Sequence, residues 1–269
     1  DAPARAEARV QQMGRVFPNT PVLNNELINK MAPSRVVKNA RKKLTLGILD
    51  CYGTPDLGLE GNRPDQSMFQ TLLIRTGLYF QDNDGRWRFA RPEELRDENL
   101  RQVWQIVESF FTNRDSARRN FGELFDQLQQ PPIGLRSGVI PILLAAGLRA
   151  FPAAVTITDP HGEYIPDIMP STIEEIENAP DEYAIEAVLL DDPTAEYLST
   201  LERIFSESEE PNAVETDPLR RCYDALEAWK ARLPRAALMS RKFTTPVLVF
   251  QRLITEVRDP ATLFLHKLF

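Results

Sequence analysis

A zinc site of the usual nitrogen and sulfur type, or a nucleophilic site that uses cysteine or histidine, would depend on four side chains in this chain. The sequence holds two cysteines and two histidines, which are Cys51, Cys222, His161 and His266. His161 lies in an Asp-Pro-His-Gly run that is typical of a tight turn, and neither histidine has a second histidine, a cysteine or a suitably spaced carboxylate nearby. A zinc centre therefore lacks its usual nitrogen and sulfur ligands, and a Ser–His–Asp or Cys–His site would depend on one isolated histidine. We expect no metal centre and no nucleophilic active site.

The two cysteines are expected to be small, partly buried residues. Two isolated thiols are typical of proteins in a reducing cytoplasm, which is the location that we predict. The sequence leaves open a disulfide between Cys51 and Cys222.

Phosphate-binding loops are absent from the sequence as well. It contains no Gly-x-x-x-x-Gly-Lys-[Ser/Thr] and no Gly-x-Gly-x-x-Gly motif, and the nearest glycine-rich run, 58–63, has no lysine. Aspartate and glutamate are abundant, but no spacing singles out a catalytic pair, so an enzyme built on carboxylates alone stays a third alternative. We predict a chain with no catalytic motif and no cofactor.

Basic side chains are the remaining candidates for a binding function. They gather on a predicted helix over 34–51, at the end of the next helix, and around Trp87 in a predicted hairpin. Clustered Lys and Arg supply the salt-dependent part of nucleic-acid binding, so these residues are the candidate nucleic-acid contacts. The alternative is an ordinary solvated helix face. The candidates are Arg35, Lys38, Arg41, Lys42, Arg75, Arg86 and Arg88.

The elements that position these side chains form a pattern that occurs twice. The first copy is a helix over 34–51, with Val37, Ala40, Leu44 and Ile48 at helical spacing, followed by a helix over 64–76 and a hairpin over 78–89. Asp82-Asn83-Asp84-Gly85 supplies the hairpin turn. The second copy comprises helices over 120–129 and 135–150 and a hairpin over 154–165. Two helices followed by a hairpin is the winged-helix plan, and the alternative is an irregular helical domain with two hairpins.

The rest of the chain is predicted to be mostly helical. Ser171 and Glu174 form a capping box for a short helix, and 183–190 has the character of a strand. We therefore predict a mainly α fold with small β-hairpins, with possible tandem winged-helix-like units and a C-terminal helical bundle. The expected domains are 1–97, 98–190 and 191–269. Further helices are predicted over 3–16, from Asn24 or Asn25 to Met31, and over 99–112, 193–205, 218–233, 245–257 and 261–269.

The charges divide the chain unevenly. The formal net charge is −7, yet residues 159–217 contain 18 acidic residues and a single basic one, Arg203, so the rest of the chain is basic. The acidic segment is expected to dock on a basic partner or on the basic part of its own chain. Two features argue against DNA: the pI near 5.1, and a helix over 135–150 that is too apolar to face a groove. The longest apolar run, Val139 to Leu148, is too short to span a membrane.

Two stretches of the chain resemble a known family. Residues 19–29 (NTPVLNNELIN), followed by a basic helix, and residues 131–144 (PPIGLRSGVIPILL), followed by an apolar helix and a hairpin, resemble large bacterial P-loop ATPases of phage-defence islands. The resemblance covers roughly residues 17–190 and implies a helical and winged-helix region outside the nucleotide-binding core. It carries over no functional residue, because the phosphate-binding loop is missing here.

The sequence thus predicts a non-catalytic interaction module of a larger phage-defence ATPase. Its partners would be DNA, or other domains or subunits of a larger assembly, contacted through the basic helix and the first hairpin. The alternative is a helical protein–protein adaptor that uses the apolar 139–151 region and the acidic segment. Because the chain begins at Asp1 and ends on an apolar helix, we expect it to be a piece of a longer polypeptide.

Overall fold

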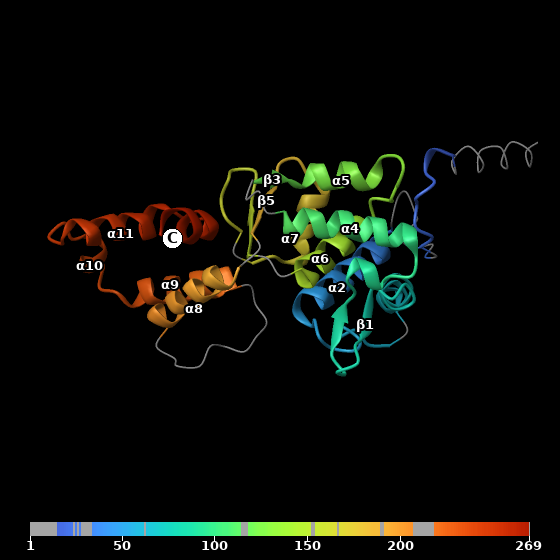
Figure 1. Cartoon of the computed structure of the whole chain (residues 1–269), viewed down its shortest axis with the longest axis horizontal. Helices are drawn as coiled ribbons and strands as arrows, with labels where there is room; N and C mark the ends of the chain where they lie inside the picture. Colours follow the sequence, from blue (N-terminus) through green and yellow to red (C-terminus); the bar gives the residue numbers. More distant parts are fainter. Residues whose placement is uncertain are drawn as a thin grey trace, which may run out of the picture. The chain divides into compact units, whose positions relative to one another are not determined.

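The computed structural model is mainly helical, with two small antiparallel sheets, which confirms the predicted fold class (Figure 1). The predicted helix over 3–16 up to residue 14, most of the helix ending at Met31, and the acidic loop 207–217 lie outside the described residues. The structure describes residues 15–23, 25, 27, 34–61, 63–113, 118–151, 154–165, 167–188, 191–206 and 218–268.

Two compact units make up the chain, and each combines segments that are far apart in sequence. Unit 1 consists of Asp1–Phe111, Asn120–Phe151 and Asp167–Glu182, and unit 2 consists of Thr112–Arg119, Pro152–Pro166 and Tyr183–Phe269. This grouping differs from the three consecutive domains expected from sequence. The difference arises because residues 154–158 form a strand that pairs with a second strand at residues 184–188. Both strands therefore belong to unit 2, whereas most of the expected domain 98–190 belongs to unit 1.

Unit 1 is built around the apolar helix α6 (Ile140–Ala150), whose residues 140–147 are all buried. The helix begins five residues later than predicted, because Pro141 occupies its first turn and residues 137–139 form a turn. Around it lie the other elements of unit 1, in chain order: α2 (Arg35–Asp50), α3 (Pro64–Phe69), η1 (Gln70–Ile74), β1 (Tyr79–Gln81), β2 (Trp87–Phe89), η2 (Pro92–Glu94), α4 (Glu98–Thr112), α5 (Phe121–Gln129) and α7 (Pro170–Asn178).

The predicted first helix–helix–hairpin group is present in unit 1. Helix α2 buries Val37, Ala40, Leu44 and Ile48, the apolar positions found from their spacing. The second helix continues from α3 into η1, a π-helical turn in which the N–H of Arg75 donates to the carbonyl of Gln70 at 2.9 Å.

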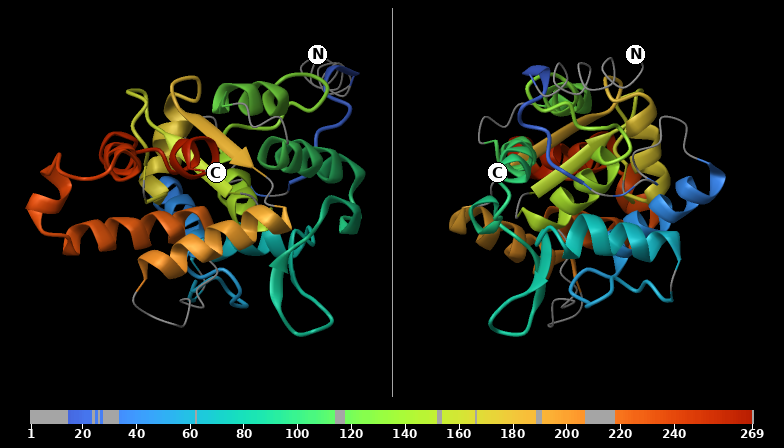
Figure 2. Two further views of the ribbon diagram at one scale, coloured as in Figure 1. Left: turned by 60° about the vertical axis from the view of Figure 1, so that its left-hand side comes forward. Right: turned by 90° about the vertical axis from the view of Figure 1, so that its right-hand side faces the viewer.

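Aromatic packing joins the β1–β2 hairpin to the helices of unit 1. The hairpin pairs Tyr79 with Phe89 and Gln81 with Trp87. The Tyr79 ring lies 4.9 Å from the Phe89 ring and 6.3 Å from the Phe69 ring of α3, centroid to centroid. In all the views of Figures 1 and 2 the turn of this hairpin extends away from the helices of unit 1.

The second predicted hairpin, over 154–165, forms only in part, because the longer pairing of its first strand is with another segment of the chain. Strand β4 (Ala154–Thr158) pairs along its whole length with β5 (Ala184–Val188), and β3 (Arg119–Asn120) completes the sheet in the order β3-β5-β4. The predicted turn at 159–162 does form, but the chain after it contributes a single bridge, from Tyr164 to Thr158. Two backbone hydrogen bonds accompany this bridge: the N–H of Asp159 donates to the carbonyl of Glu163, and the N–H of Ile165 donates to the carbonyl of Ile157, both at 2.9 Å. Thr158 pairs with both Tyr164 and Ala184, so the short hairpin and β5 lie on opposite edges of β4. The second copy of the pattern therefore has its two helices, α5 and α6, and a short hairpin whose first strand also belongs to the three-stranded sheet.

The predicted capping box at Ser171 and Glu174 is also wrong. Helix α7 begins at Pro170, and the N–H of Met169 donates to the Thr172 hydroxyl at 3.3 Å. The N-cap is Met169, two residues before the predicted Ser171, because proline suits the first helical position: its fixed φ is helical and its missing N–H is not needed there.

The C-terminal helices predicted from sequence are present in unit 2. They are α8 (Asp192–Phe205), α9 (Pro218–Arg232), α11 (Thr245–Glu256) and η3 (Thr262–Lys267), and a further short helix that was not predicted, α10 (Arg235–Met239), follows α9. They share a core in which Leu198, Leu226 and Phe264 are fully buried. Cys222 belongs to this core, and burial raises the pKa of its thiol to about 12. Both Cys222 and Cys51 are free thiols, which answers the question of a disulfide between them.

Gly47 on α2 provides a test of the packing in unit 1. A Cβ at this position would lie 2.4 Å from the backbone oxygen of Leu57. Alanine is intrinsically better than glycine in a helix by about 1 kcal/mol, but a backbone oxygen cannot rotate away. We expect Gly47→Ala to lower the free energy of unfolding by about 1–3 kcal/mol, measured by urea denaturation. Asn39→Ala, on the exposed side of the same helix, is the control and should be neutral or stabilising; a neutral Gly47→Ala would contradict this packing.

Candidate nucleic-acid interface

The basic face of α2 is partly neutralised by the acidic helix α7. The Arg41 guanidinium donates to both carboxylate oxygens of Glu177, at 2.8 and 2.5 Å, and the two side chains are only 11% and 17% exposed. Such a bidentate, largely buried pair is a strong form of charge-assisted hydrogen bond. Arg41 is therefore held inside the fold, although the sequence marks it as a candidate phosphate contact.

Lys42 and Lys38 also face the carboxylates of α7. The Lys42 ammonium lies 3.5 Å from Glu174 in an exposed pair, and the charge of Lys38 acts on Glu177. Burial raises the pKa of Glu177, and Arg41 opposes that change. Glu174 and Glu177, two residues of the acidic segment, therefore bind the basic helix of their own chain.

Arg88 of the hairpin is engaged in a similar way. Its guanidinium donates to both carboxylate oxygens of Glu94, at 2.8 and 2.7 Å, lies 3.5 Å from Asp82, and stacks over the Phe80 ring at 4.5 Å. The hydrogen bonds from Arg88, together with one from the Arg91 N–H, lower the pKa of Glu94 to about 2. A phosphate group would have to displace this carboxylate to reach Arg88.

Four of the seven predicted contacts keep exposed cationic groups. Within the described part of the chain, Arg35, Lys38, Arg75 and Arg86 form no ion pair. Arg35 and Lys38 lie on α2, Arg75 follows η1, and Arg86 lies beside the hairpin turn. The predicted contacts therefore fall into two groups. Arg41, Lys42 and Arg88 form ion pairs with carboxylates and are called committed, and the four cations without an ion pair are called available.

Two further available arginines were missed by sequence reasoning. Arg63 directly precedes α3, and Arg96 lies between η2 and α4; both are exposed, and neither forms an ion pair among the described residues. Neither arginine belongs to a run of basic residues in the sequence. The usable signal was position, because each lies next to a helix terminus.

The second helix of the group presents a polar surface between two of these cations. Ser67, Gln70 and Arg75 are exposed along α3 and η1. Gln66, on the same helix, donates to the carbonyl of Leu59 at 2.8 Å. The outward-facing surface therefore runs from Arg63 through Gln70 to Arg75.

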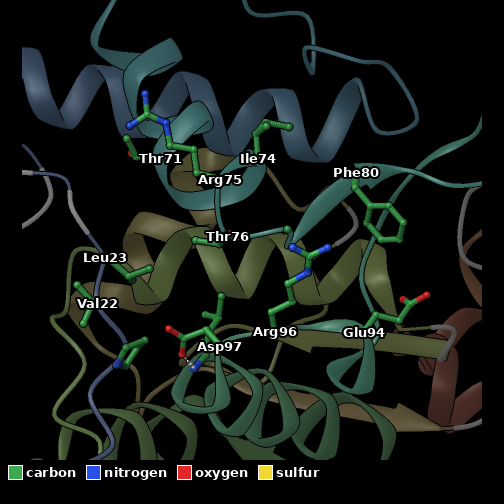
Figure 3. A pocket seen from close by; sticks show the side chains of 13 residues that line it. Val22, Leu23, Thr71, Ile74, Arg75, Thr76, Phe80, Glu94, Arg96 and Asp97 are labelled. Carbon is green, nitrogen blue, oxygen red and sulfur yellow. Dashed lines mark hydrogen bonds between the residues drawn. The ribbon is translucent and has the colours of Figure 1, made fainter.

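A cavity of about 650 Å³ opens beside this helix (Figure 3). Its walls come from residues 21–23, η1 and the turn after it, β1, and the connection between η2 and α4. Arg75 and Arg96 both line it, and in Figure 3 the Arg96 side chain extends toward Thr76 and Phe80.

The described side chains give little support for a metal site or a catalytic acid. Within the described ranges, no group of three or more His, Cys, Asp and Glu residues is placed to hold a metal ion. His266 pairs with Glu186 at 2.8 Å. The pKa of Glu108 is raised, chiefly by burial and also by Glu93, but a raised pKa alone does not define a catalytic acid. Among the residues that the structure describes, no helix is both long and apolar enough to cross a membrane.

Comparison of the chain with protein-family models, with curated proteins and with solved structures finds no significant match.

The two ion pairs on α2 predict different costs of mutation. Arg41→Ala leaves the buried Glu177 carboxylate without its partner, and removing one member of a buried pair typically costs about 3–5 kcal/mol. Lys42→Ala breaks an exposed pair worth about 0–1 kcal/mol. Urea denaturation of both variants measures the difference. Equal, small effects would mean that Arg41 and Glu177 are not paired as described.

The Arg88–Glu94 pair predicts a pH dependence. Because the folded pKa of Glu94, about 2, lies below the ordinary value of 4.5, the pair stabilises the fold above pH 4.5 and loses this effect as the pH falls toward 2. A double-mutant cycle with Arg88→Gln and Glu94→Gln should give a coupling energy of under about 1 kcal/mol at pH 7, since the pair is partly exposed. The coupling should shrink between pH 5 and pH 3; a pH-independent coupling would be inconsistent with an ionised Glu94.

Proposed function

We propose that this chain is a non-catalytic interaction module that contacts the phosphate backbone of a nucleic acid through the helix–helix–hairpin group of unit 1. The observation that carries the proposal is the placement of three exposed arginines that form no ion pair among the described residues. Arg63 and Arg75 lie at the two ends of the second helix, and Arg86 lies beside the turn of the hairpin.

The plan of the group supports this assignment. In helix-turn-helix proteins the second helix approaches the groove, and in the winged-helix variant a hairpin can add a further contact to the backbone. Here Ser67 and Gln70 are exposed on that second helix, between the two arginines, and the hairpin turn extends away from the helices (Figure 2). Cations at these three points would hold two or more phosphates, and the polar side chains would lie between them.

The proposal narrows the predicted set of contacts. Arg41, Lys42 and Arg88 are left out, because each already has a carboxylate within ion-pair distance. Arg35 and Lys38 stay candidate contacts outside the central three.

The same proposal extends to the setting of the chain. Its resemblance to phage-defence ATPases supports a role within a larger cytoplasmic assembly, in which another part would hydrolyse the nucleotide. DNA is then the favoured nucleic acid, and other domains or subunits of the assembly are the favoured protein neighbours.

A helical adaptor that binds only protein is the second candidate. The apolar 139–151 region can no longer serve it, because residues 140–147 are buried in unit 1. A different observation favours it: large apolar side chains are exposed around α10 and α11 in unit 2. They are Met239, Phe243, Val247 and Val249, with exposed fractions of 75%, 42%, 44% and 53%.

Salt-dependent binding tests the nucleic-acid proposal. We expect labelled duplex DNA to bind the chain in fluorescence anisotropy, with an affinity that falls steeply between about 50 and 200 mM salt. Arg75→Gln combined with Arg86→Gln should make the slope of log affinity against log salt shallower by about 2, since two phosphate contacts are lost.

Arg203→Gln, an exposed arginine of α8 in unit 2, is the matched control and should leave the slope unchanged. Equal slopes for the control and the double variant would remove this surface from the binding site. Absence of DNA binding even at low salt would leave the adaptor as the surviving candidate.

A further inference from the structure

The charge that the cavity beside η1 presents to a ligand differs from the sum of the formal charges of its lining residues. Four charged residues line it, namely Arg75, Arg96, Glu94 and Asp97, so the formal charges cancel. A ligand, however, experiences only those charges that the protein has not already compensated.

Both carboxylates in the wall are compensated within the fold. Glu94 receives two hydrogen bonds from Arg88 and one from the backbone N–H of Arg91, at 2.7–2.8 Å. Asp97 is the residue before α4, and its carboxylate accepts the N–H of Leu100 at 2.8 Å, so it caps a helix whose N-terminus favours negative charge.

The two arginines in the wall have no such compensation. Among the described residues neither Arg75 nor Arg96 forms an ion pair, and both are exposed. The charge that the cavity offers to a ligand is therefore positive.

The hydroxyl groups in the wall already have partners. Thr71 donates to the carbonyl of Ser67 at 2.7 Å and accepts from the Asn25 amide at 2.7 Å. Thr76 donates to the carbonyl of Leu72 at 2.6 Å. Much of the remaining wall is apolar and comes from Val22, Leu23, Ile74, Phe80 and Leu100. The cavity thus combines cationic groups with apolar surface.

We propose that this cavity binds a small organic anion, with a carboxylate or phosphate monoester group held by Arg96 and an apolar body lying against Ile74 and Phe80. A volume of about 650 Å³ lies within the range of small-molecule sites, roughly 300–1,000 Å³. A guanidinium suits both head groups, because it donates in a fork that matches two anionic oxygens.

Figure 3 indicates why Arg96 is the anchor of this site. Its side chain extends toward Thr76 and Phe80, at the cavity wall, whereas the Arg75 side chain extends toward Thr71. The inference does not rest on the proposed nucleic-acid contact, since Arg96 belongs only to the cavity and Arg86 only to the hairpin surface.

Ligand-observed NMR titration of the whole chain tests the proposal. The probes are phenyl phosphate and 3-phenylpropionate as the two anion classes, inorganic phosphate as the anion without an apolar body, and benzylamine as the cation of similar shape. We expect saturable binding of at least one of the two aromatic anions, and binding of both inorganic phosphate and benzylamine at least about tenfold weaker than of that anion. Whichever anion binds more tightly identifies the head group.

Variants separate this site from the nucleic-acid surface. Arg96→Gln removes a charge-assisted pair and should weaken binding of the aromatic anion by about tenfold or more. Arg86→Gln, an exposed arginine outside the cavity, should leave it unchanged, and Arg75 is kept in every variant because it belongs to both surfaces. Equal melting temperatures of the variants exclude unfolding as the cause.

Three results would overturn the proposal: no binding of either aromatic anion at millimolar concentration, equally tight binding of benzylamine, or binding that is unchanged in Arg96→Gln. DNA binding that persists while the small anions fail would overturn the cavity proposal alone. The reverse result would overturn the nucleic-acid proposal alone.

Discussion

The paired charges of Arg41 and Glu177 are the interaction on which the layout of unit 1 depends. They join α2 to α7, although the two residues are 136 positions apart in the sequence, and both side chains are largely buried. A buried carboxylate without a partner is costly, so α7 stays against α2 as long as both charges are present. This pair explains how a chain with net charge −7 holds a strongly basic helix: part of the acidic segment neutralises it from within.

Internal neutralisation determines which cations remain for a partner. Arg88 is committed to Glu94 in the same bidentate manner as Arg41 is to Glu177, so the hairpin contributes Arg86 rather than both of its arginines. Among the exposed arginines that form no ion pair in the described part of unit 1, Arg63, Arg75, Arg86 and Arg96 lie next to α3, η1, the hairpin turn and η2. There they favour two kinds of anion, a polymer backbone outside the cavity and a small molecule inside it, and Arg75 belongs to both surfaces.

Periodicity alone was sufficient for most helices and for the first hairpin, because their apolar positions and turn residues are local signals. Val37, Ala40, Leu44 and Ile48 are buried as their spacing predicts, and Asp82–Gly85 forms the expected turn. The pairing of β4 with β5 was missed, because the two strands are about 30 residues apart in the sequence and no local pattern links them. The commitment of Arg41, Lys42 and Arg88 was missed for a related reason. A run of basic residues shows where charge lies, but only the fold shows which carboxylates face it. The cavity joins segments from residues 21 to 100, which no local pattern brings together.

Arginine-selective labelling with phenylglyoxal, followed by mass spectrometry of the whole chain with and without DNA, tests most directly the claim that carboxylate pairing decides which cations are available. The account predicts that Arg63, Arg75 and Arg86 react rapidly in the free chain and are protected by DNA, while Arg41 and Arg88 react slowly in both states. Rapid labelling of Arg41 in the folded chain, at the rate of Arg86, would contradict it.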